Sequence, residues 1–149
     1  MHSVLGPYPA SVLKSIHMKR LERKIDLITG GASGIGKIMA RLMLERKAKV
    51  IIWDINQEKI DETISEFSNK GEVFGFNVDV SDLSEIKKTA EALKTAHGNI
   101  DVLINNAGIV VGKYFHEHSS SEIEKTLSIN SAAPMHICNQ FLTEMMEAN

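Results

Sequence analysis

The sequence predicts an α/β fold in which a parallel sheet carries helices on both faces, a doubly wound arrangement. From Lys24 onward, short apolar runs alternate with segments whose apolar residues recur at the helical period of 3.6. A glycine-rich turn joins the first apolar run to the first helical segment. The chain has 149 residues, 43% of them hydrophobic and 24% charged, so we expect one globular domain with its own core.

The first two strands and helices follow from these patterns. The first strand is predicted at residues 25–28. The second strand is predicted at residues 49–54, whose apolar run is typical of a buried parallel strand. The first helix is indicated by a stripe of Ile35, Ile38, Met39, Leu42 and Met43, and the second by Ile60, Ile64 and Phe67. Gly71 is expected to end the second helix.

The remaining elements are predicted in the same way. Residues 77–80 end a third strand, and Ser81 is expected to be the N-cap of a third helix that stops at Gly98. The apolar stripe of this helix consists of Leu83, Ile86, Ala90 and Leu93. A fourth strand covers residues 100–104.

A last helix is predicted to start at Ser119, which can form a capping box with Glu122, and to run toward Met146. Pro134 removes the N–H that would bond to the carbonyl of Asn130, so we expect a kink or bulge there. In the C-terminal part of this helix, a four-stranded sheet could not cover all of Ile137, Phe141, Leu142 and Met145.

The glycine turn spans residues 29–36 with the sequence TGGASGIG. Glycines let backbone N–H groups approach a phosphate closely, and the N-terminus of the following helix adds partial positive charge. The turn therefore predicts a pyrophosphate site formed by Gly30, Ser33, Gly34, Ile35 and Gly36. A plain strand-to-helix turn would explain the same glycines.

Asp54 ends the second predicted strand, eighteen residues beyond Gly36. A carboxylate at this place accepts hydrogen bonds from the adenosine ribose hydroxyls of a dinucleotide and repels a 2′-phosphate. The glycine turn contains no basic residue that would reverse this preference, so NAD is the predicted cofactor. The alternative is that Asp54 only caps the next turn, since Asp-Ile-Asn is good turn material.

Together with two more segments, this pattern resembles the short-chain dehydrogenase/reductase family over roughly residues 24–149. The matching features are T-G-x-x-x-G-x-G, the strand-end Asp54, Asp79-Val80, the run N-N-A-G at 105–108, and Asn130 on a helix. The resemblance implies a Rossmann-type sheet with strand order 3-2-1-4. The phrases at residues 53–56 and 123–126 resemble the branch that contains 17β-hydroxysteroid and retinol dehydrogenases.

The resemblance also implies roles for individual residues. Asp79 would accept a hydrogen bond from the adenine amino group and Val80 would offer its backbone N–H, although Asp79 could instead only cap the turn before the third helix. Further cofactor contacts are implied at Ile55, Asn106, Ala107 and Gly108. The family transfers hydride between a nicotinamide and an alcohol or ketone. Of its catalytic residues, only the asparagine that holds a water in the proton relay is carried over, as Asn130.

The family's acid/base pair, a tyrosine followed four residues later by a lysine, is absent. Val12 lies four residues after Tyr8, and His118 lies four residues after Tyr114. We therefore expect the N-terminal half of such an enzyme, which binds NAD weakly and does not catalyse alone. It would meet an alcohol or ketone substrate only if the missing half were supplied. A stand-alone nucleotide-binding module, and an interaction partner that pairs with another such chain or with itself through the last helix, stay open.

Several other functions are disfavoured. His116 and His118, with Glu117, lack a third ligand nearby, so no metal site is expected. Lys37 is not followed by Ser or Thr, which excludes a P-loop. The net charge of −2 gives no argument for nucleic-acid binding. The single cysteine, Cys138, is expected to be buried and indicates a cytoplasmic location, and no apolar run reaches the length of a transmembrane segment.

Three features fit the pattern less well. Residues 1–23 precede the predicted domain and are expected to form a loosely packed extension, in which Val12, Leu13 and Ile16 could line a short helix. Asp26 lies in the first strand, where an unpaired carboxylate is costly. Lys47 ends the first helix, where the family pattern usually has glycine; if the backbone there is left-handed, lysine costs about 1 kcal/mol.

Overall fold

The computed structural model describes residues 21–148. The predicted short helix around Val12 lies outside them. The first elements are β1 Ile25–Thr29, α2 Gly34–Leu44, β2 Lys49–Asp54, α3 Gln57–Phe67, β3 Val73–Asn77 and α4 Leu83–His97. These are followed by β4 Val102–Ile104, the 3-10 turn η1 Phe115–Glu117, α5 Ser120–Leu127, the π-helical segment η2 Ser128–Ala132 and α6 Ala133–Glu147.

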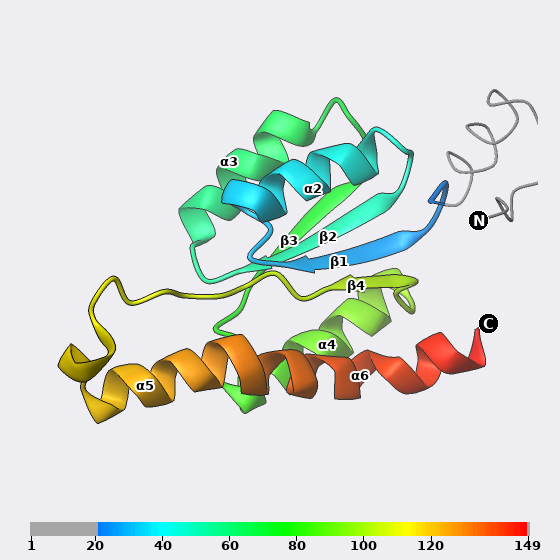
Figure 1. The fold of residues 1–149 in the computed structure, drawn as a ribbon. Coiled ribbons are helices and arrows are strands. Elements are labelled where there is room, and N and C mark those ends of the chain that lie inside the picture. Colours follow the sequence, from blue (N-terminus) through cyan, green and yellow to red (C-terminus); the bar gives the residue numbers. More distant parts are fainter. Residues whose placement is uncertain (1–20, 149) are drawn as a thin grey trace, which may run out of the picture.

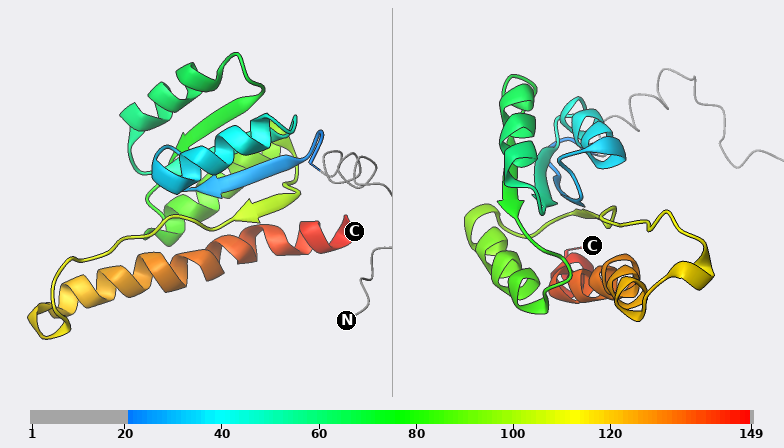
Figure 2. Two further views of the ribbon diagram at one scale, coloured as in Figure 1. Left: turned by 45° about the horizontal axis from the view of Figure 1, so that its top comes forward. Right: turned by 90° about the vertical axis from the view of Figure 1, so that its left-hand side faces the viewer.

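The four strands form one parallel sheet in the order β3-β2-β1-β4, which confirms the predicted topology. Helices α2 and α3 cover one face, and α4 and α6 cover the other (Figure 1). Figure 2 shows the same layers from two further directions. Because all strands run the same way, the loops at their carboxyl ends meet at one edge of the sheet.

Successive side chains along each strand point to opposite faces of the sheet, and this produces two hydrophobic cores. Leu27 and Ile51 pack with the apolar faces of α4 and α6, whereas their neighbours Ile28 and Ile52 pack against α2 and α3. All four side chains are fully buried. The sheet is thus held from both sides, and its strand ends are fixed in position.

Some predicted boundaries are wrong by a few residues. Strand β3 ends at Asn77, so Val78, Asp79 and Val80 follow it as a loop. The N-cap of α4 is Asp82, whose carboxylate accepts from the N–H groups of the first turn, while the Ser81 hydroxyl donates to Asp79. Helix α3 ends four residues before Gly71.

The disturbance predicted at Pro134 is confirmed. Helices α5 and α6 form one long rod (Figure 1), and the π-helical segment η2 interrupts it directly before Pro134. A proline has no N–H to close the usual helical bond, and the wider turn of a π-helix accommodates this loss.

Asp26 and Lys47, the two residues that fit the sequence pattern poorly, both have unfavourable surroundings or backbone in the structure. Asp26 is fully buried, and neither of its carboxylate oxygens has a hydrogen-bond partner. Burial, with a smaller contribution from the nearby Asp101 carboxylate, raises the pKa of Asp26 to about 6, against a lowering influence from Lys24. Lys47 has a left-handed backbone, with φ +61°. Arg23 shares this conformation, with φ +64°, and was not predicted to do so.

The prediction that the sheet could not cover all four apolar residues of α6 holds for one of them, Leu142. Ile137 and Phe141 are buried and Met145 packs against them, because α4 lies alongside α6 on the sheet. Leu142 remains 52% exposed. Cys138, expected to be buried, is only partly buried, and its sulfur accepts a hydrogen bond from the Asn105 side chain at 3.4 Å.

Candidate functional site

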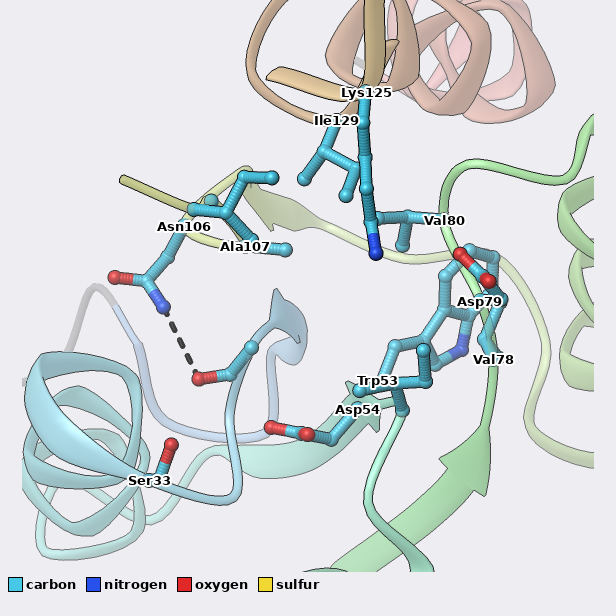
Figure 3. A pocket seen from close by; sticks show the side chains of 14 residues that line it. Ser33, Trp53, Asp54, Val78, Asp79, Val80, Asn106, Ala107, Lys125 and Ile129 are labelled. Carbon is cyan, nitrogen blue, oxygen red and sulfur yellow. Dashed lines mark hydrogen bonds between the residues drawn. The ribbon is translucent and has the colours of Figure 1, made fainter. Parts of the chain in front are cut away.

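A pocket of about 380 Å³ opens where the carboxyl ends of β1, β2 and β4 meet the loop after β3 (Figure 3). It is lined by Gly30, Ser33, Trp53, Asp54, Ile55, Val78, Asp79, Val80, Asn106, Ala107, Gly108, Ile109, Lys125 and Ile129. Nine of these are predicted site residues. The other four, Gly34, Ile35, Gly36 and Asn130, do not line it.

The glycines of the turn after β1 serve different purposes. Gly36 has no room for a side chain, since a Cβ there would lie 2.1 Å from the Gly30 carbonyl oxygen. Gly34 has a left-handed backbone with φ +51°, and a Cβ there would meet no atom within 4 Å. Gly36 is therefore required for packing of the turn, whereas a side chain at Gly34 would meet open space.

The start of α2 suits an anion. Ser33 is its N-cap residue, but the Ser33 side chain makes no capping hydrogen bond. The first turn carries no acidic residue, and its backbone N–H groups have no partner within the helix. Unpaired N–H groups and the helix dipole favour a negatively charged ligand such as a pyrophosphate.

Asp54 is half-buried at the end of β2 and lines the pocket. Its carboxylate accepts hydrogen bonds from the N–H of Ala32 at 3.1 Å and from the N–H of Asn56 at 3.2 Å. The predicted capping role is thus present. Because the two bonds fix the carboxylate at the pocket wall, capping and ligand binding are compatible.

Asp79 is also engaged by its own turn. Its Oδ1 accepts from the N–H of Ser81 at 2.8 Å and from the Ser81 hydroxyl at 2.6 Å. Val78 is buried and Val80 is half-buried, so Asp79 lies between two apolar residues of the pocket wall. This part of the pocket combines a carboxylate with flat apolar contact, which suits an aromatic base bearing an amino group.

Asn106 and Thr29 hold the glycine turn against β4. The Asn106 side chain donates to the carbonyl oxygens of Thr29 and Gly30 at 3.0 and 3.1 Å (Figure 3 marks one such bond). The buried Thr29 hydroxyl accepts from the N–H groups of Asn106 and Ala107, both at 3.0 Å. Asn106 therefore shapes the pocket through the backbone that it fixes.

Asn130 performs a similar task for the loop after β4. Its Oδ1 accepts from the N–H of Ile109 at 2.9 Å, and its Nδ2 donates to the carbonyl of Ile109 at 2.8 Å. A Cβ at Gly108 would lie 3.4 Å from Asn130 Oδ1. The side chain of Asn130 is thus occupied in fixing the loop.

Five pocket residues were not predicted: Trp53, Val78, Ile109, Lys125 and Ile129. Four of them adjoin predicted residues in the sequence and could have been found as neighbours. Lys125 has no such signal, because it reaches the pocket only through the way α5 is placed over the strand ends.

Comparison with known proteins agrees with this geometry. Residues 24–149 match the family model described as short chain dehydrogenase. The chain belongs to the short-chain dehydrogenase family. The uncharacterised oxidoreductase YxbG of Bacillus subtilis is 36% identical over 134 residues, covering 89% of this chain and 49% of YxbG. Estradiol 17-beta-dehydrogenase 11 of Macaca fascicularis is 34% identical over 132 residues, covering 88% of this chain and 44% of the relative.

Solved structures of short-chain dehydrogenases are similar as well. A metagenomic short-chain oxidoreductase in complex with NADP superposes with a TM-score of 0.81 at 29% identity, over 86% of this chain and 59% of that one. The 2-keto-3-deoxy-D-gluconate dehydrogenase of Streptococcus agalactiae superposes with a TM-score of 0.78 at 29% identity, over 91% of this chain and 52% of that one. The short-chain dehydrogenase chain therefore spans about half the length of the curated relatives it matches.

Tyr114 is not a lining residue of the pocket. It is 74% exposed and its ring stacks on His116, with centroids 5.9 Å apart. Within residues 21–148, no group of three or more His, Cys, Asp or Glu is placed to hold a metal ion. No helix in that range is long and apolar enough to cross a bilayer.

Proposed function

We propose that residues 24–149 are the cofactor-binding part of an NAD(H)-dependent oxidoreductase that acts on alcohols or ketones. The observation that carries this proposal is the convergence of three features on one pocket. These are Ser33 at the start of α2, the fixed carboxylate of Asp54, and the Asp79-Val80 wall.

Each feature suits one part of the dinucleotide. The pyrophosphate would bind at the α2 N-terminus, the adenosine ribose at Asp54, and the adenine between Val80 and Ile129 with its amino group toward Asp79. When bound, the nicotinamide supplies the hydride chemistry. The residues of this chain bind and orient the cofactor.

Asp54 supports NAD over NADP. Its carboxylate accepts from two backbone N–H groups, which hold it at the place where a 2′-phosphate would lie in the proposed pose. Several similar solved structures are complexes with NADP or NADPH. The preference for NAD proposed here therefore rests on Asp54 and not on the fold.

Alone, these 149 residues are proposed to bind NAD without turnover. The sequence holds two tyrosines, and neither has a lysine four residues later. Turnover would then require a chain that supplies the acid/base tyrosine and its lysine. A stand-alone nucleotide-binding module would share the same pocket. As part of the proposal we place the protein in the cytoplasm, with which its lone thiol, Cys138, is compatible.

Calorimetric titration with NAD and NADP tests the proposal. The wild type should bind NAD at least tenfold more tightly, since two like charges about 4 Å apart near a protein surface repel each other by about 4 kcal/mol. The pair of changes Asp54→Asn and Ile55→Arg should bring the two affinities together or reverse them. Asparagine keeps an acceptor for the N–H of Ala32, so the turn should persist.

Asp61→Asn is the matched control, because it removes the same charge from exposed helix α3 outside the pocket. It should leave both affinities unchanged. Equal binding of NAD and NADP by the wild type would refute the cofactor assignment, and binding of neither would refute the site.

A further inference from the structure

Lys125 is the one cation among the residues that line the pocket. Its side chain extends from α5 into the pocket, toward the wall formed by Val80 and Asp79 (Figure 3). Within residues 21–148 it has no hydrogen bond, and no carboxylate oxygen lies within 4 Å of its ammonium group. Lys125 is exposed on α5 and directed at the cavity, so its ammonium group is available to a ligand that enters there.

Neighbouring lysines behave differently. Lys113 pairs with Glu122 at 2.6 Å, which helps to hold the pKa of Glu122 at about 2, and Lys94 pairs with Glu144. Both lie near the same long rod of α5 and α6 and are used to fix it. Lys125 makes no such ion pair, so its ammonium group is not committed to fixing the rod.

The part of the pocket that Lys125 faces is the base end. The proposed anion-binding end lies at Ser33, at the start of α2, and Asp54 marks the ribose position proposed above. Beyond Asp54 the wall becomes apolar at Val80 and Ile129, which a flat base can contact on its faces. The Lys125 ammonium enters from α5 on this side of the pocket, away from the glycine turn (Figure 3).

We propose that the Lys125 ammonium group covers the purine of the bound nucleotide, where it contacts the π face of the ring or donates a hydrogen bond to a ring nitrogen. This inference rests on the proposed function and deepens it by assigning a specificity-determining residue for the base. A cation over an electron-rich ring is attractive, and more so when the ring is partly removed from water. The ligand class is a purine nucleotide rather than a phosphate alone.

The test compares AMP with ribose 5-phosphate, which has the same phosphate and no base. Both are titrated by nuclear magnetic resonance, which also measures millimolar dissociation constants. Lys125→Met keeps the length of the side chain and removes its charge. It should weaken AMP binding about three- to tenfold and leave ribose 5-phosphate unchanged. Lys125→Arg should retain most of the AMP affinity, since guanidinium also binds aromatic faces.

Lys88→Met is the matched control, because Lys88 is exposed on α4 and does not line the pocket. It should change neither affinity. If Lys125→Met loses affinity for AMP and for ribose 5-phosphate equally, Lys125 attracts the phosphate and the inference is overturned. Unchanged affinity for AMP would overturn it as well. In these two cases the proposed function stands if the wild type binds AMP, whereas a wild type that does not bind AMP overturns both.

Discussion

At the scale of single residues, Asp26 is the clearest departure from what the fold favours. It occupies a fully buried position on β1, on the same face as Ile28, with no partner for either oxygen. Burial raises its pKa to about 6 from a usual value of 3.8. The folded protein thus holds this proton more tightly than the unfolded chain, which makes ionisation of Asp26 a cost to stability.

We expect Asp26→Val to stabilise the protein in a pH-dependent way. Because the folded pKa is raised, the contribution of Asp26 is most favourable below pH 4, falls between about pH 4 and 6, and is constant above. A shift of about two units corresponds to about 3 kcal/mol. Urea unfolding should therefore show a gain for Asp26→Val that is about 2 kcal/mol larger at pH 7.5 than at pH 4, where the unfolded carboxyl is already partly ionised.

Comparing the wild type with Asp26→Val separates the pH dependence due to Asp26 from that of acids which titrate alike in both proteins. Asp101, which is bound by Lys24 and by the N–H of Ile25, and Glu122 have pKa values that are lowered. The stabilising contribution of Glu122 is lost as the pH falls, equally in both proteins, whereas that of Asp101 also depends on Asp26 because the two carboxylates repel each other. A gain that does not change between pH 4 and 7.5 would mean that Asp26 is neutral or solvated throughout.

At the scale of elements, the turn between β1 and α2 separates two roles that look alike in the sequence. Gly34→Ala should leave the fold intact at a cost of about 1 kcal/mol for the left-handed backbone, because its Cβ meets nothing within 4 Å. The same methyl group projects into the space proposed for the pyrophosphate. NAD binding should fall at least tenfold.

Gly36→Ala should instead damage the fold. The Cβ of an alanine at position 36 would lie 2.1 Å from the Gly30 carbonyl oxygen and 2.6 Å from Asn106 Nδ2. The turn and the Asn106 side chain that holds it must therefore move. Thermal unfolding followed by circular dichroism should show a much lower midpoint for Gly36→Ala than for Gly34→Ala. If Gly34→Ala binds NAD as the wild type does, the pyrophosphate does not lie at this turn.

Much of the element plan could be predicted because it is encoded locally. The strands, the glycine turn and the disturbance before Pro134 follow from short-range periodicity and backbone chemistry. The choice of Asp82 over Ser81 as N-cap was missed because both residue types suit the position. Lys125 was missed for a different reason, since its place in the pocket depends on the packing of a helix far along the chain.

The roles of Asn106 and Asn130 could also not be predicted, because they depend on contacts between distant segments. Their sequence positions are those expected from the family resemblance, but spacing does not reveal hydrogen bonds between distant segments. Asn106 binds the turn after β1, and Asn130 binds Ile109 in the loop after β4. Both shape the site through backbone that they fix, which only the three-dimensional structure shows.

At the scale of the whole molecule, the described chain leaves one side open. Strand β4 pairs with β1 and forms an edge of the sheet. On the adjoining α6, three exposed apolar side chains recur at helical spacing, namely Met135, Leu142 and Met146. This stripe, rather than the buried Ile137 and Phe141, is the apolar surface of the helix that a partner could cover.

We therefore predict that the chain self-associates through α6. Changing Leu142 and Met146 together to Glu should lower the apparent mass measured by light scattering across a concentration series, because charges on the stripe oppose its burial. Ile38→Glu is the control, since Ile38 is similarly exposed but lies on α2, on the opposite face of the sheet. A wild type that stays monomeric and binds no apolar dye would contradict the prediction. An uncovered apolar stripe next to an open edge strand should lead either to self-association or to dye binding.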